Sequence, residues 1–123
     1  MVSRLLKYSL TFFAGLCLLI SNVSAQEIRK EKTLQPGKVF EACITMQSGD
    51  KLEYTFSTST ALWFNIHYHD DEKVIYAVPF GLTSSESAVF TSAESNSYCM
   101  MWKNTGPVSI ELTLRYQLHR NNS

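Results

Sequence analysis

Apolar and polar residues alternate with a period of two along most of this chain after residue 35. The clearest case is the segment 108–118, where apolar side chains occupy every second position and polar or charged ones lie between them. Because successive side chains of a β-strand point to opposite faces, this pattern predicts a strand with one buried and one exposed face. The side chains expected to point inward are Val108, Ile110, Leu112, Leu114, Tyr116 and Leu118. No segment of this region has the 3.6-residue period of a helix.

Three further segments show the same alternation, at 39–46, 52–56 and 62–68. Their expected inward residues are Phe40, Ala42, Ile44, Met46, Leu52, Tyr54, Phe56, Leu62, Phe64, Ile66 and Tyr68. Shorter strands are predicted at 74–78, 88–91 and 97–103. Half-buried strands of this kind are typical of antiparallel sheets that keep one face in water.

Turn-forming residues separate these segments. Turns are predicted at Ser48-Gly49-Asp50, Asp70-Asp71-Glu72 and Asn104-Thr105-Gly106-Pro107. The polar stretch 57–60 predicts a break, and Pro79 and Gly81 are expected to end the strand at 78. About seven or eight short strands, with turns roughly every 8 to 12 residues, indicate an all-β, single-domain antiparallel β-sandwich of jelly-roll type.

The first 25 residues predict a secretory signal peptide. Arg4 and Lys7 give it a positive start, and Leu10–Ile20 is an apolar run of about 11 residues. Val23-Ser24-Ala25 fits the small-residue rule for cleavage before Gln26. Because the run is shorter than the roughly 20 residues that span a bilayer, we expect a periplasmic or secreted protein with no membrane anchor after cleavage.

The mature chain is expected to consist of an N-terminal arm or edge strand at 26–35, the sandwich at 36–119 and a frayed tail at 120–123. Loss of the signal peptide removes Arg4 and Lys7 and leaves 9 basic and 11 acidic residues, a net charge of −2. With no basic stripe on the chain, nucleic acid is not expected as a partner.

Cys43 and Cys99 are the cysteines of the mature chain. An even pair in an exported protein favours a disulfide, because the compartments outside the cytosol are oxidising; two buried free thiols are the alternative. Both residues occupy the face opposite the inward residues of their strands, which a bridge between two strands would require.

Several short motifs occur in an order known from one domain family: Pro36-Gly37, Phe40-Glu41-Ala42-Cys43, Gly49-Asp50 before the strand at 52–56, Phe64-Asn65-Ile66-His67, and Tyr98-Cys99-Met100-Met101-Trp102-Lys103-Asn104. Together they resemble the GOLD (Golgi dynamics) domain, the luminal domain of cargo receptors of the early secretory pathway. The resemblance covers nearly all of 35–118. It implies a disulfide between Cys43 and Cys99, because that family links these two strands, and a compact sandwich that binds protein.

The resemblance has a limit after the sandwich. The cargo receptors continue into a coiled coil, a membrane helix and a cytosolic sorting tail, whereas this sequence stops at Ser123. Coat recruitment and cargo sorting are therefore not expected. What the resemblance implies here is an exported, stand-alone protein-binding module.

The strand at 62–68 carries the candidate binding face. Trp63, Asn65, His67 and His69 share its polar side, which we expect to face solvent, with Trp63 as the binding anchor. The alternative for Trp63 is cover by a second sheet. His67 and His69 are also a candidate metal pair for copper, zinc or nickel, to which Asp70 or Asp71 could add an oxygen ligand. A plain polar strand face is the favoured interpretation, and metal binding or buffering is the alternative function.

Catalytic motifs are missing from the sequence. It contains no Gly-x-Ser-x-Gly, no glycine-rich phosphate loop and no His-Glu-x-x-His. The acidic pair Asp70-Asp71 lies in a predicted turn, where nothing would desolvate it for acid–base catalysis. We therefore expect a binding protein without enzymatic activity and without a cofactor.

Overall fold

A computed structural model of the protein describes residues 15 and 26–122, so the predicted signal peptide lies outside the described region apart from Gly15. Six strands and no helix occur in the described part, which accordingly contains no helix that could cross a membrane. The strands are β1 (Ile28–Leu34), β2 (Val39–Met46), β3 (Lys51–Asp70), β4 (Lys73–Thr91), β5 (Asn96–Lys103) and β6 (Ile110–His119).

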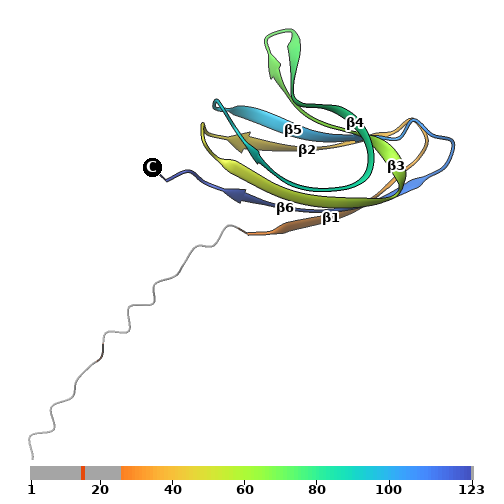
Figure 1. The fold of residues 1–123 in the computed structure, drawn as a ribbon, viewed down its shortest axis with the longest axis horizontal. Helices are drawn as coiled ribbons and strands as arrows, with labels where there is room; N and C mark the ends of the chain where they lie inside the picture. The colour runs from red at the N-terminus through yellow and green to blue at the C-terminus, as the bar shows by residue number, and fades with distance from the viewer. Residues whose placement is uncertain (1–14, 16–25, 123) are drawn as a thin grey trace, which may run out of the picture.

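All six strands join one antiparallel sheet, which curls into a half-barrel (Figure 1). The strand order is β1-β6-β3-β5-β2, and β4 pairs with the other edge of β3. The segment 26–35, expected as an arm or edge strand, contains β1 at one end of this order. The prediction of an all-β, antiparallel single domain is confirmed. The predicted two-layer sandwich is not, because the hydrogen bonding forms one continuous sheet.

The long strand β3 is where the sheet changes direction. Its first part, 51–58, pairs with β6, and its later part, 63–67, pairs with β5. The pairing with β4 is irregular between Ser57 and Leu62. The polar stretch that predicted a break between strands therefore marks the point at which β3 exchanges one neighbour for another.

The count of seven or eight strands was wrong because β3 and β4 run through two predicted breaks. Pro79 does not end β4, although it has no N–H to donate to a neighbouring strand. Because β4 pairs only with β3, Pro79 lies in an edge strand, where a missing donor is tolerated. The register is also irregular on both sides of Ile66, which accommodates the proline segment.

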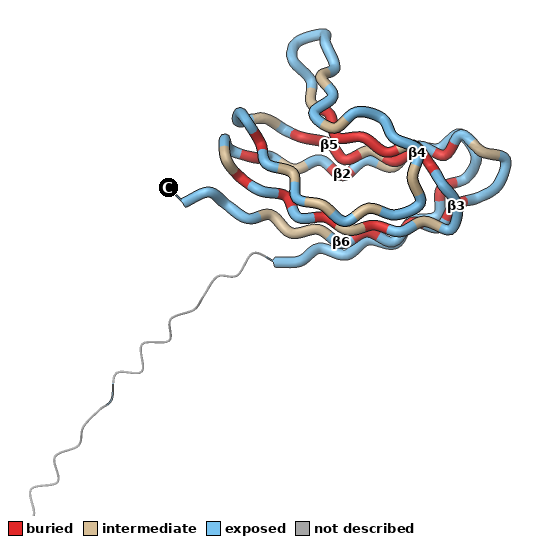
Figure 2. Tube along the Cα trace, in the orientation of Figure 1, coloured by how far each residue is buried: buried red, intermediate tan, exposed pale blue. Residues whose placement is uncertain are grey.

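The core fills the inner side of the curled sheet. Its buried side chains are Leu34, Ala42, Met46, Leu52, Tyr54, Phe56, Leu62, Phe64, Ile66, Tyr98, Met100, Trp102, Ile110, Leu112 and Leu114. Figure 2 shows the buried positions along the central strands and the exposed ones at the hairpin tips and the N-terminal arm. Trp102 lies at the centre, with ring centroids 5.3 Å from Phe64 and 5.5 Å from Phe56.

The alternation predicted most of these positions. One inward assignment was wrong: Val108 lies before β6 begins and is exposed. Asn104 explains the difference, because its side-chain Nδ2 donates to the carbonyl of Val108 at 2.8 Å and holds that residue in the loop. The turns predicted at 48–50 and 70–72 occur between consecutive strands.

Candidate binding face

The four residues predicted as a binding face lie together on the outer side of β3, in its later part. Strand pairing places Trp63 opposite Leu82 of β4 and Lys103 of β5. Four residues further along β3, His67 lies opposite Tyr76 of β4 and Cys99 of β5. The predicted common face is thus formed, and it extends across both neighbouring strands.

Burial differs along this face from what the polar pattern predicted. His69 is exposed and Trp63 is half-buried, but Asn65 and His67 are buried. The expectation of a solvent-facing strand was therefore wrong for Asn65 and His67. Aromatic residues of β4 explain this, since the ring of Tyr76 lies 6.1 Å from His67 and 5.1 Å from Phe80.

An apolar patch borders the polar centre. The ring of Phe80 packs edge-on against Trp63, with centroids 6.5 Å apart. We define the outer apolar patch as Val39, Trp63, Val74, Tyr76, Phe80 and Leu82. Apart from Trp63, its members are 41% to 59% exposed. Sequence reasoning missed Phe80 and Leu82, because Pro79 was expected to end the strand that carries them.

The polar centre is a hydrogen-bonded pair. His67 Nδ1 lies 2.8 Å from Asn65 Oδ1, and His67 Nε2 lies 3.6 Å from Glu41 Oε1 on β2. Burial lowers the pKa of His67, an effect that the Glu41 carboxylate opposes and that His69 reinforces. The imidazole is therefore neutral near pH 7. The Nδ2 of Asn65 is buried with no partner among the described residues.

The predicted metal pair has little support from its surroundings. The rings of His67 and His69 lie edge to face with centroids 5.3 Å apart. Asp70 and Asp71 are exposed at the tip of the β3–β4 hairpin, which projects from the sheet in Figure 1. Within the described region, the only group of three ligand-type side chains at metal spacing is Glu41, Cys43 and Cys99. Metal binding by the histidine pair stays a prediction.

The predicted disulfide between Cys43 and Cys99 is confirmed. It joins β2 to β5 at directly opposed positions of the ladder. Cys99 is in turn opposite His67, so the bridge lies beside the polar centre on the outer side of the sheet. Cys43 is exposed and Cys99 is buried.

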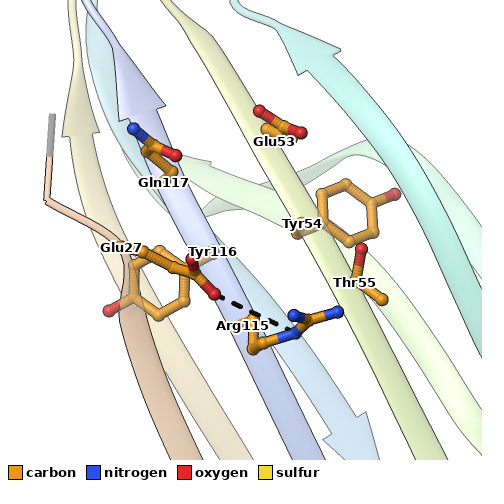
Figure 3. Close-up of a pocket in the computed structure, with 7 residues that line it drawn as sticks. All are labelled: Glu27, Glu53, Tyr54, Thr55, Arg115, Tyr116 and Gln117. Atoms are coloured by element: carbon orange, nitrogen blue, oxygen red, sulfur yellow. Dashed lines mark ion pairs between the residues drawn. The ribbon is translucent and has the colours of Figure 1, made fainter. Parts of the chain in front are cut away.

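Two hollows lie elsewhere on the sheet. A depression of about 150 Å³ lies over β6, the first part of β3 and the residue before β1, and there Arg115 pairs with Glu27 at 3.9 Å. Figure 3 shows the residues that line it. Its volume is below the roughly 300 Å³ of small ligand pockets. A wider, open hollow of about 650 Å³ lies between β2 and the end of β6, lined in part by Ile44 and Leu118. Neither hollow contains the predicted face residues.

Comparison with known proteins gives structural likeness only. No protein-family model matches the sequence, and no curated protein matches it. The solved structure of PliG from Aeromonas hydrophila, a periplasmic inhibitor of g-type lysozyme, matches with a TM-score of 0.60 at 10% identity, over 77% of this chain and 88% of that chain.

Two weaker matches are a de novo designed double-stranded β-helix and the capsular polysaccharide assembling protein CapF from Staphylococcus aureus. The designed protein has a TM-score of 0.43 at 17% identity, over 72% of this chain and 97% of its own. CapF has a TM-score of 0.49 at 13% identity, over 81% of this chain and 26% of its own. At these identities the likeness to PliG concerns the fold: the curled antiparallel sheet of this chain is one that a natural exported protein also adopts.

Proposed function

We propose that this protein is an exported, non-catalytic module that binds another protein through the outer apolar patch. The observation that carries the proposal is the aromatic group formed by Trp63, Tyr76 and Phe80 around the buried Asn65–His67 pair. Exposed apolar side chains that gather in one place mark interaction surfaces, whereas scattered ones do not.

The composition of the patch fits a protein contact. Tryptophan and tyrosine are the residues most often found at the energetic centre of protein interfaces. The aromatic side chains are uncharged, while two charged side chains lie among the residues of this face: Lys103 between Trp63 and Val39 in the ladder, and Glu41 beside His67. Protein interfaces typically combine apolar contacts with polar and charged ones.

Two comparisons support the same class of function. PliG, whose fold is similar, is named as an inhibitor of an enzyme and so binds protein. The resemblance to GOLD domains is part of the proposal, and the bridge between β2 and β5 supports it because that family shares the link. The bridge also supports export, since disulfides persist in oxidising compartments.

The experiment compares crosslinking from two positions on the outer side of the sheet. A photoreactive side chain at Phe80 should capture a partner in the native compartment, and the same group at Val89 should not. Val89 is a matched control because it lies on the same strand, is 58% exposed and is outside the patch. Purified g-type lysozyme is the first defined partner to test, by inhibition of its lytic activity.

A partner identified in this way should bind Trp63→Ala at least about 30-fold more weakly, as expected for an interface anchor worth about 2 kcal/mol. Val89→Ala should bind with unchanged affinity. Equal crosslinking from positions 80 and 89, or equal affinity of Trp63→Ala and wild type, would exclude the outer apolar patch as the binding surface.

A further inference from the structure

Three side chains of metal-ligand type converge beside the polar centre, and a fourth borders them. The Glu41 carboxylate and the sulfurs of Cys43 and Cys99 lie within 4.8 Å of one another. The fourth is His67, whose Nε2 lies 3.6 Å from the same carboxylate. Strand pairing fixes the arrangement, because Cys99 is directly opposite both Cys43 and His67.

Asn65 orients the imidazole for coordination. Its Oδ1 can only accept a hydrogen bond, so the Nδ1 of His67, 2.8 Å away, is the nitrogen that carries the proton. In a neutral ring Nε2 then bears the lone pair and faces Glu41. Nε2 and the Glu41 carboxylate then face each other at 3.6 Å, a spacing at which a proton or a metal ion can lie between them. A metal-binding histidine typically donates its second N–H to a nearby oxygen in this way.

In the oxidised protein the disulfide occupies both sulfurs, which leaves only Glu41 and His67 as donors. Four protein ligands are typical of a stable tetrahedral zinc site. We propose that reduction of the Cys43–Cys99 disulfide creates a Zn²⁺ site formed by Glu41, Cys43, His67 and Cys99. The disulfide thus acts as a redox switch for metal binding.

The chemistry balances with an external dithiol as reductant. Its thiolate attacks the sulfur of Cys43, which is the exposed cysteine, and Cys99 leaves as a thiolate. The second thiol of the reductant then releases Cys43, so that two electrons pass to the protein and the reductant leaves as a disulfide. When Zn²⁺ binds, the two cysteine thiols lose their protons to solvent.

This site differs from the histidine pair predicted from sequence. It uses His67 but not His69, and its other ligands come from β2 and β5 rather than from the hairpin tip. It shares His67 with the centre of the proposed binding face, but it requires neither Trp63 nor Phe80.

The experiment titrates the purified protein with Co²⁺, a spectroscopic substitute for Zn²⁺, after reduction by a phosphine without oxygen. The reduced wild type should bind one Co²⁺ with thiolate-to-metal charge-transfer absorption, and Zn²⁺ should displace it. The oxidised protein should show no such absorption. Circular dichroism of each sample, with and without Zn²⁺, reports whether the sheet is formed.

Variants assign the ligands. The double change Cys43→Ser with Cys99→Ser should abolish the charge-transfer absorption. Both His67→Ala and Glu41→Gln should lower the affinity at least about tenfold. His69→Ala is the matched control, since it removes the neighbouring exposed imidazole, and it should bind as the wild type does.

Three results would overturn the proposal. The first is a reduced, folded protein that binds no Co²⁺. The second is a reduced protein that has lost its sheet and does not regain it with Zn²⁺, because a metal held by a folded site stabilises that fold. The third is Co²⁺ affinity that is unchanged in His67→Ala or equal in the oxidised protein.

Discussion

Asp50 accepts a hydrogen bond from the backbone N–H of Asn121 at 2.8 Å, across 71 positions of the chain. The same carboxylate accepts from the N–H of Gln47 at 2.8 Å and pairs with Arg120 at 2.9 Å. Residues 120–123 were expected to fray, yet this contact holds Arg120 and Asn121 against the turn between β2 and β3. A single buried carboxylate therefore joins the C-terminal segment to the body of the sheet.

We expect Asp50→Asn to lower the melting temperature at neutral pH and to expose residues 120–122 to hydrogen exchange. The hydrogen bonds from Asn121 and Gln47, together with Arg120, lower the pKa of Asp50 below its ordinary value of 3.8. Because the folded-state pKa is the lower one, this stabilisation is complete above about pH 4 and is lost as the pH falls through the folded value.

The difference in melting temperature between Asp50→Asn and wild type should therefore shrink on acidification below about pH 4. Asp71→Asn is the control, because Asp71 is exposed at a hairpin tip and its left-handed backbone suits asparagine. A difference that stays constant from pH 7 to pH 2 would contradict the assigned role of the carboxylate.

Asn104 should be among the most sensitive polar positions of the protein. Its fully buried side chain donates to the carbonyls of Leu34 and Val108 and accepts from the N–H of Gly106. Asn104→Ala leaves these backbone groups unpaired, and we expect the free energy of unfolding to fall by about 2–4 kcal/mol.

Chemical denaturation measures the effect of Asn104→Ala, with Asn96→Ala as the control. Among the residues that the structure describes, the side chain of Asn96 accepts from its neighbour, the N–H of Ser97, and its loss should cost under about 1 kcal/mol. Equal costs for the two variants would show that the three bonds of Asn104 do not stabilise the connection between β1 and β6.

Trp102 combines the largest buried side chain with an unpaired polar atom. Its ring is fully buried against Phe40, Phe56 and Phe64, while its Nε1 has no partner among the described residues. Trp102→Ala should cost about 3–5 kcal/mol of unfolding free energy. Trp102→Phe should cost about 1–2 kcal/mol, because the smaller ring removes the unpaired N–H together with some contact area. Similar losses for the two variants, measured by urea denaturation, would contradict this interpretation.

The sequence predicted the fold most accurately where alternation alone decides it. The positions from Leu62 to Ile66 alternate inward as expected, because this depends on strand periodicity. The cysteine pair is bridged as expected from the phases of the two residues and from the predicted export of the chain. Strand ends were less predictable. Pro79 and the polar stretch 57–60 read locally as breaks, but their effect depends on which strands lie alongside, and single-strand patterns do not contain that information.

The candidate face shows the same division. That Trp63 and His67 share one side of a strand follows from a period of two. The burial of Asn65 and His67 does not follow from that period, because it depends on Tyr76 and Phe80 of the next strand. Glu41 was also missed as a neighbour of His67, because β2 reaches it only through the pairing of both strands with β5.

The last prediction concerns alkaline stability and Tyr54. This side chain is buried, and its hydroxyl donates to Glu86 Oε2 at 3.4 Å. Burial, and then the nearby Glu86 carboxylate, raise the pKa of Tyr54 far above its ordinary value of 10.0. Above about pH 10 the unfolded chain therefore loses a proton that the folded protein keeps, so stability falls as the pH rises toward the folded value.

For Tyr54 alone this decline amounts to about 1.4 kcal/mol per pH unit. Tyr54→Phe removes the ionisable group, so the free energy of unfolding should decline less steeply between pH 10 and pH 11.5, by up to about that amount per unit. Denaturant titrations at a series of alkaline pH values measure the slope. Tyr76→Phe is the matched control, because it removes the hydroxyl of an exposed tyrosine, and its slope should equal that of wild type. If Tyr54→Phe and wild type lose stability in parallel above pH 10, the phenol of Tyr54 does not stay protonated in the folded sheet, and the alkaline loss must come from other groups.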